Sequence, residues 1–114
     1  MDKTARFQEL MHCLLQEYYE WHSQAKSNAD TELVVICDDS NKHYQLLRLG
    51  WRGEDRVRSQ IFYVRIKNQK LWIEEDWTEE GIAVELMRAG VSKEDIVLAF
   101  NPPMVRQYTE FAVA

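Results

Sequence analysis

Four short segments rich in β-branched and aromatic residues follow one another in the middle of this chain, with clusters of turn-forming residues between them. Segments of this composition, with apolar and polar residues in alternation, are typical of β-strands. We predict strands over residues 32–38, 43–51, 57–67 and 70–75. The connections are too short to return the chain to a parallel neighbour, so the pattern predicts a four-stranded antiparallel meander.

A helix is predicted on each side of these strands. Over residues 4–22, large apolar side chains recur every three or four positions, which places them on one side of a helix. They are Phe7, Leu10, Met11, Leu14, Leu15, Tyr18 and Tyr19. A second helix is predicted over residues 78–89, with Thr78 as its N-cap and Gly90 just after its C-cap. Strands flanked by helices indicate an α+β fold, in a single domain spanning residues 1–114.

The segments outside these elements are predicted to be irregular. Residues 23–30 are small and polar, which is typical of a loop. The Pro102-Pro103 pair disfavours a helix there, because the residue before a proline avoids the helical conformation. The chain closes with three large apolar side chains, Tyr108, Phe111 and Val113. Since chain ends fray unless they are packed, this tail either packs on its own domain or docks on a partner.

Charge is unevenly distributed along the chain. The 114 residues carry a net charge of −5, but residues 48–70 contain seven basic and two acidic side chains. Five basic residues there could contact DNA or an acidic partner: Arg52, Arg56, Arg58, Arg65 and Lys67. Side chains alternate along a strand, so Arg56 and Arg58 should point away from Arg65 and Lys67 unless a β-bulge intervenes. The acidic total is unlike that of proteins that bind DNA unaided.

No motif in the sequence indicates an active site. The histidines are scattered, and neither a zinc-binding spacing, a nucleophile beside a base nor a phosphate-binding glycine loop is present. We therefore predict a protein without metal, cofactor or enzymatic activity. The alternative is a divalent metal held by Glu74, Asp76 and Glu79, although such acids are also common at strand ends and helix starts. Cys13 and Cys37 lie among apolar residues and are predicted to be buried thiols.

The location and assembly of the protein are constrained only weakly. No apolar run approaches the roughly 20 residues of a membrane-spanning helix, and the first residues lack the apolar segment of a signal peptide. We therefore expect a cytoplasmic protein that does not enter a membrane. The sequence leaves open whether it forms a homo-oligomer.

From Tyr44 onward, the order and spacing of many short segments resemble those of the XisI family, the fdxN element excision controlling factors of cyanobacteria. The N-terminal helix agrees only in its pattern. The segments are residues 44–47, 50–51, 66–68, 72–73, 76–79, 81–83, 85–86, 93–98, 102–103 and 106–114. Trp77, Ser92 and Asn101 depart from the residues expected at their positions.

The resemblance implies a role in programmed DNA rearrangement, in which a separate recombinase cuts and rejoins the DNA. XisI-like proteins act there as accessory factors beside a companion, XisH, and the family offers no established catalytic group. Two functions are therefore expected. The first is a non-enzymatic accessory protein that binds an XisH-like companion. The second is a directionality factor that contacts DNA through the five basic residues.

Overall fold

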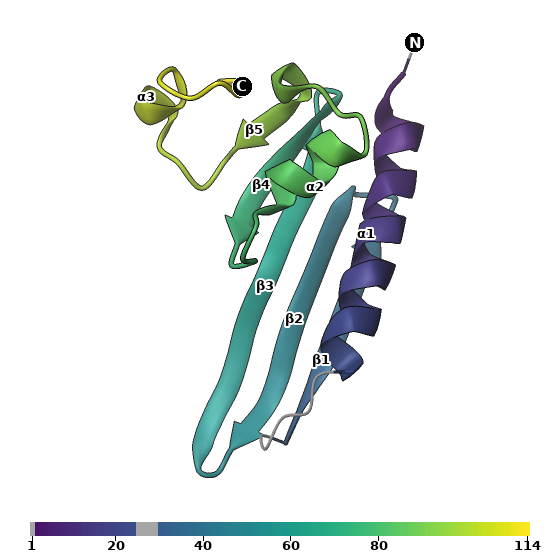
Figure 1. Cartoon of the computed structure of the whole chain (residues 1–114), viewed down its shortest axis with the longest axis vertical. Helices are drawn as coiled ribbons and strands as arrows, with labels where there is room; N and C mark the ends of the chain where they lie inside the picture. The colour runs from purple at the N-terminus through teal and green to yellow at the C-terminus, as the bar shows by residue number, and fades with distance from the viewer. Residues whose placement is uncertain (1, 25–29) are drawn as a thin grey trace.

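The computed structural model describes residues 2–24 and 30–114, so residues 25–29 of the predicted loop lie outside the described part of the chain. Figure 1 shows a sheet with α1 and α2 on one face and the C-terminal segment beside its β5 edge. The elements are α1 (Thr4–Gln24), β1 (Asp30–Asp38), β2 (His43–Arg52), β3 (Asp55–Lys67), β4 (Lys70–Asp76), α2 (Ile82–Arg88), the 3-10 turn η1 (Lys93–Asp95), β5 (Ile96–Leu98) and α3 (Pro103–Arg106). The predicted α+β class is confirmed.

The sheet contains one strand more than the sequence predicted. Its spatial order is β1-β2-β3-β4-β5, and the first four strands form the predicted antiparallel meander. The additional strand, β5, runs parallel to β4, and α2 lies in the connection between the two. A parallel bridge between Val97 and Ala112 brings the end of the chain back to this edge. The sheet is therefore mixed rather than purely antiparallel.

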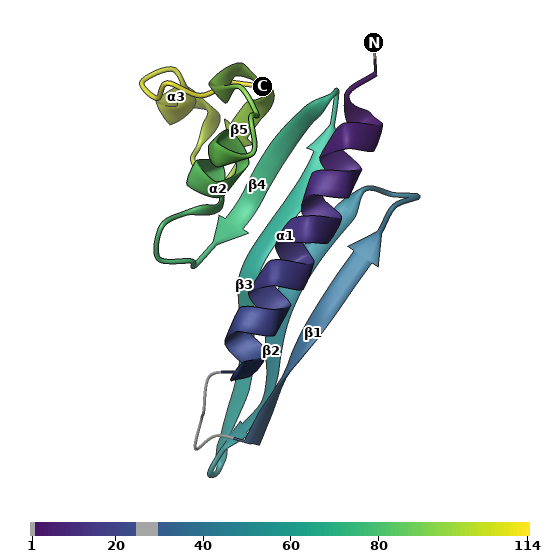
Figure 2. The ribbon, with the colours of Figure 1, turned by 45° about the vertical axis from the view of Figure 1, so that its right-hand side comes forward.

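The core lies between the sheet and the two helices that cover it (Figure 2). The predicted apolar side of α1 is confirmed for Phe7, Met11, Leu14 and Leu15, which are buried, whereas Tyr19 is exposed. Each buried side chain of this size contributes about 1.5–3 kcal/mol to folding. The sheet, α2 and the residue Val91 after it supply the remaining members: Tyr44, Leu46, Phe62, Val64, Ile66, Leu71, Ile73, Ile82, Leu86, Val91 and Ile96. None of the described helices is long and apolar enough to cross a membrane.

The second helix begins later than predicted. Its N-cap is Gly81, not Thr78, because the carboxylate of Asp76 accepts hydrogen bonds from the Ile82 amide at 2.7 Å and the Thr78 amide at 2.9 Å. Residues 77–81 are thus held in a turn before the helix starts. The predicted end is confirmed, since Gly90 has φ +96° and its amide donates to Met87 at 3.0 Å. A positive φ at this position is typical of glycine after a helix C-cap.

Two further predictions are wrong. The proline pair does not exclude a helix, because Pro103 is the first residue of α3, where a missing amide hydrogen is tolerated. Cys13 and Cys37 are exposed thiols rather than buried ones. Cys13 lies on α1 outside its buried side, and Cys37 lies on β1, the edge strand. Burial of the two thiols was predicted from their apolar neighbours in the sequence, which do not show how far α1 covers the β1 edge of the sheet.

Candidate interaction surfaces

A β-bulge in β3 decides which way its basic side chains point. Leu46 of β2 lies opposite Phe62, but the next residue, Leu47, lies opposite Gln60. Ile61 is therefore an extra residue in β3, and the alternation of its side chains is reset at that point. Residues that pair directly across two strands share a face of the sheet, so the register assigns each side chain to a face.

The bulge places four of the five predicted basic residues on one face. Arg56 pairs with Trp51 and Arg58 with Leu49, on the face opposite to the buried Leu46. Beyond the bulge, Arg65 pairs with His43, also on that face, and Lys67 shares its alternation. We call this side, which α1 and α2 do not cover, the open face. It carries Leu47, Leu49 and Trp51 of β2 and Arg56, Arg58, Arg65 and Lys67 of β3.

The fifth predicted residue, Arg52, does not belong to this group. It pairs with Asp55 on the side of the sheet that carries the helices. Along β3, Arg58 and Lys67 are nine residues apart, which corresponds to about 30 Å of strand. The open face therefore has a basic group at each end rather than one continuous patch.

Aromatic rings lie beneath these cations. At the hairpin end, the Arg56 guanidinium carbon is 5.3 Å from the centre of the Trp51 ring. At the other end, the Trp72 ring is contacted by Lys67 at 5.0 Å, Arg106 at 5.6 Å and Arg65 at 5.8 Å. Such cation–π contacts hold the charged groups over the sheet.

Arg65 differs from the other cations of the open face because it has an acidic partner. Its Nε lies 3.5 Å from a carboxylate oxygen of Glu74. Among the described ion pairs, none involves Arg56, Arg58 or Lys67. Three cations of the open face therefore remain available to an anionic ligand.

The predicted acidic site is not assembled. Glu74 pairs with Arg65, and the Asp76 carboxylate is used by the backbone at the start of α2. Glu79 is exposed within the turn that precedes α2. In the described part of the chain, Glu74, Asp76 and Glu79 do not form a group close enough to share one ion. Two of these acids have other roles: Glu74 forms an ion pair with Arg65, and Asp76 accepts hydrogen bonds at the start of α2.

The C-terminal segment is fastened to its own domain. The Arg106 side chain donates hydrogen bonds to the carbonyl oxygens of Asn101 at 3.0 Å, Ala99 at 3.3 Å and Val113 at 3.3 Å. The Ala112 amide donates to the Ile96 carbonyl at 2.9 Å, and the half-buried Phe111 packs against the core. The sequence left open whether the tail packs on its own domain or docks on a partner. Phe111 packs within the domain.

The same segment leaves an apolar surface exposed. Tyr108 is 83% exposed, Met104 74% and Val113 52%. Together with Phe100 and Val105, which are also exposed, we call these side chains the C-terminal patch. The sequence analysis named Tyr108 and Val113 as part of a tail that could dock on a partner, but it did not name Phe100, Met104 or Val105. The proline pair was the signal that could have identified them. The chain leaves β5 near these prolines, so apolar residues beside them are not buried within the sheet.

A groove on the helix side has the opposite charge to the open face. It encloses about 740 Å³ between the end of α1 and the start of α2. Its walls carry one cation, Arg88, which pairs with Glu80 and Glu85. They also carry four aromatic or imidazole rings and four acids: Tyr18, Trp21, His22, Trp77, Glu17, Glu79, Glu80 and Glu85. Burial, aided by Arg48, lowers the pKa of His22 below its ordinary value of 6.5. A polyanion such as DNA is therefore disfavoured on this side of the sheet.

Comparison with known proteins identifies the family. A family model described as XisI protein matches residues 1–113. The chain belongs to the XisI family. A crystal structure of a XisI-like protein from Anabaena variabilis ATCC 29413 has a TM-score of 0.89 and 35% identity to it, covering 98% of this chain and 100% of that one. A second crystal structure, of the fdxN element excision controlling factor XisI from the same organism, has a TM-score of 0.83 and 34% identity.

The second match covers 99% of this XisI-family chain and 100% of the Anabaena chain. No curated protein sequence matches the present chain. The resemblance inferred from the residues after Tyr44 is thus confirmed, and it extends over α1, where only the pattern had agreed. The two structural matches leave almost none of this chain uncovered.

Proposed function

We propose that this XisI-family chain is a non-catalytic accessory factor for the excision of a DNA element, and that it acts by binding a companion protein of the XisH type. Family membership supports the excision role, since one relative of known structure is described as the fdxN element excision controlling factor. The companion is the partner that the family resemblance implies. A regulator of this kind needs an interaction surface rather than an active site.

The observation that carries this proposal is the exposed C-terminal patch on a fastened segment. Large apolar side chains that are exposed together are typical of surfaces that bind other proteins. Tyrosine and methionine are both enriched at interfaces, and tyrosine often dominates the binding energy. Because Arg106 already holds the segment through three carbonyl groups, docking would cost little ordering of the chain. Tyr108, the most exposed member, is the expected anchor.

Co-expression with the XisH-like companion, followed by size-exclusion chromatography and calorimetry, tests this function. The wild-type pair should elute as one complex, and Tyr108→Ala should weaken binding by roughly 30-fold or more, the loss typical of an interface anchor. Tyr19→Ala is the matched control, because Tyr19 is an exposed tyrosine on α1 rather than in the patch. Separate elution of the wild-type proteins at micromolar concentration would reject the proposal.

Direct contact with DNA is a second candidate function, and one observation favours it. The extra residue Ile61 brings Arg56, Arg58, Arg65 and Lys67 to a face that α1 and α2 leave uncovered. Cations stacked on aromatic rings at both ends of such a face suit a phosphate backbone. In this role the chain would hold DNA beside the companion. Absence of binding to element-end duplex at low salt would reject it.

A further inference from the structure

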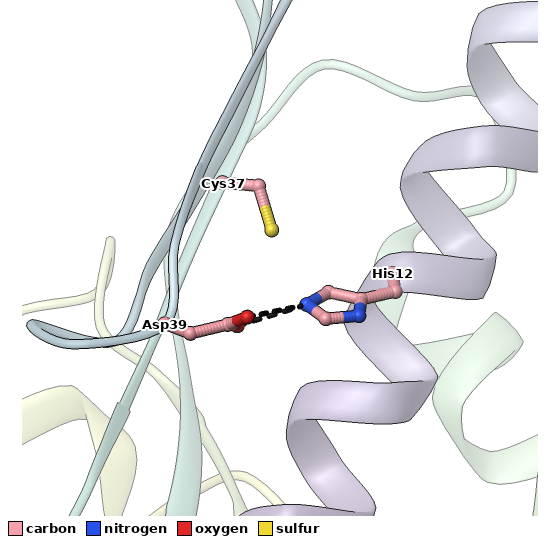
Figure 3. Close-up of side chains that lie close together, drawn as sticks. All are labelled: His12, Cys37 and Asp39. Carbon is pink, nitrogen blue, oxygen red and sulfur yellow. Dashed lines mark hydrogen bonds and ion pairs between the residues drawn. The ribbon is translucent and has the colours of Figure 1, made fainter.

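Three potential metal ligands from two separate parts of the chain meet beside the β1–β2 turn. Figure 3 shows His12 of α1 facing Asp39, with the sulfur of Cys37 pointing into the space beside them. His12 Nε2 lies 2.8 and 3.1 Å from the two carboxylate oxygens of Asp39. The ligand atoms of all three residues lie within 4.8 Å of one another. The three side chains are exposed, so an ion can reach them from solvent.

We propose that His12, Cys37 and Asp39 bind a zinc ion, with a fourth position left for water or for a donor from another molecule. The donor set decides the metal. An imidazole nitrogen, a sulfur and a carboxylate oxygen are the three ligand types that proteins offer to zinc. Calcium and magnesium prefer oxygen ligands alone, and a sulfur ligand is unsuited to both.

The observed separations are close to those of a zinc site. In a tetrahedral site, the zinc–ligand lengths place a nitrogen and an oxygen about 3.3 Å apart, and a sulfur and a nitrogen about 3.6 Å apart. His12 and Asp39 would have to separate by only a few tenths of an ångström, exchanging their direct hydrogen bond for two bonds to the ion. The Cys37 sulfur would have to approach by about 1.2 Å at most. Cys37 is exposed on the edge strand, so its side chain is free to make this movement.

A second layer of contacts aims the carboxylate at His12. Tyr44 is completely buried, and its hydroxyl donates a hydrogen bond to Asp39 Oδ1 at 2.7 Å. Gln8 on α1 donates to the Asp39 carbonyl at 2.9 Å, which ties the turn to the helix. Metal-binding carboxylates are commonly oriented by hydrogen bonds of this kind. The buried tyrosine therefore distinguishes this group from a chance meeting of surface side chains.

A nucleophilic role for the same cysteine is disfavoured by the geometry. In the described structure, His12 Nε2 is engaged by the Asp39 carboxylate, and no hydrogen bond joins it to the Cys37 thiol. A catalytic cysteine needs a base within hydrogen-bond reach of its sulfur. Metal binding is the chemistry that uses all three groups together.

Titration of the reduced, metal-stripped full chain with Zn²⁺ by calorimetry tests the proposal, and Co²⁺ provides a spectroscopic probe. We expect one ion per chain and a thiolate-to-cobalt charge-transfer band. Cys37→Ser should abolish that band, and His12→Gln should weaken zinc binding by roughly 100-fold. Tyr44→Phe should weaken it about tenfold, because Tyr44 acts only by positioning Asp39. Cys13→Ser is the matched control, since it removes the other exposed thiol and should change neither measurement.

Three outcomes would overturn the proposal. The first is the absence of saturable zinc binding to the wild-type chain at micromolar concentrations. The second is equal binding by wild type and Cys37→Ser, and the third is a loss in Cys13→Ser as large as in Cys37→Ser. Because the substituted ligands are exposed, the variants should keep the fold, and circular dichroism confirms this for each one before titration.

Discussion

Replacing Arg56 and Arg58 together by alanine separates DNA binding through the open face from general electrostatic attraction. Both residues lie at the hairpin end of β3, on the face that α1 and α2 do not cover. Neither residue has an acidic partner among the described ion pairs, so their removal leaves no carboxylate of such a pair exposed. The effect can therefore be predicted from the number of cations that remain.

The magnitude follows from counterion release. Each phosphate neutralised by a cation contributes about −0.9 to the slope of log K against log salt concentration. Arg56, Arg58 and Lys67 are available, whereas Arg65 is paired with Glu74, so the wild-type slope should be about −2.7. Affinity should then fall about 40-fold between 50 and 200 mM salt. In the double variant only Lys67 remains, which predicts a slope of about −0.9 and a fall of roughly fourfold.

Fluorescence anisotropy with a labelled duplex, repeated at several salt concentrations, measures these slopes. The duplex should be longer than about nine base pairs, the length that matches the spacing of about 30 Å between Arg58 and Lys67. Arg52→Ala is the control. It removes one positive charge, half of what the double variant removes, from the same hairpin but from the helix side of the sheet, and it should leave the slope unchanged.

The open-face hypothesis would be refuted by either of two results. An unchanged slope in the double variant would mean that Arg56 and Arg58 do not meet phosphates. A slope reduced by Arg52→Ala, by about half as much as in the double variant, would mean that DNA responds to the net charge of the hairpin and not to the face created by the bulge.

Three further predictions concern the scaffold. A Cβ at Gly50 would lie 2.1 Å from the Asp30 carbonyl oxygen, with φ at +151°, so Gly50→Ala should lower the free energy of unfolding by about 3 kcal/mol; an unchanged urea midpoint would contradict the close approach of β1. Asp76→Ala removes the acceptor for the Ile82 and Thr78 amides and should cost about 1–2 kcal/mol in thermal melts, whereas the exposed Glu75→Ala should cost little. Burial lowers the pKa of His22 in the folded chain, so the unfolded chain binds the proton first. The free energy of unfolding should therefore fall as the pH falls through about 6.5, and His22→Gln should reduce that fall; an identical pH profile in the variant would contradict it.

The elements that the sequence predicted well are the long ones, in which the apolar pattern repeats several times. The apolar side of α1 and the alternation in four strands repeat often enough to define both the element and its buried face. Strand β5 was missed because it has only three residues, Ile96–Leu98. Its pairing with β4 depends on where α2 returns the chain, which no local pattern encodes.

The candidate sites were predicted less well, for two different physical reasons. The sequence showed only that a β-bulge would change which way the basic side chains point. It could not locate the bulge at Ile61, because an extra residue in one strand is defined by its register with the neighbouring strand. The group of His12, Cys37 and Asp39 was missed because metal motifs are recognised by regular spacing within one element. Here the histidine lies on α1 and the other two residues on the far side of a connection, so only the packing of α1 against the sheet brings them together.

The hairpin end of the open face and the C-terminal patch lie at opposite ends of the molecule. The molecule is 46 Å long, and Figure 1 places the β2–β3 hairpin at one end of this axis and α3 at the other. Arg56 and Arg58 are therefore remote from Tyr108, and substitutions at such distant sites are generally independent. Loss of companion binding in Tyr108→Ala with the salt slope intact, and the converse in the arginine variant, would describe a chain that bridges a protein and DNA. Loss of both in one variant would instead mean that a single surface serves both ligands.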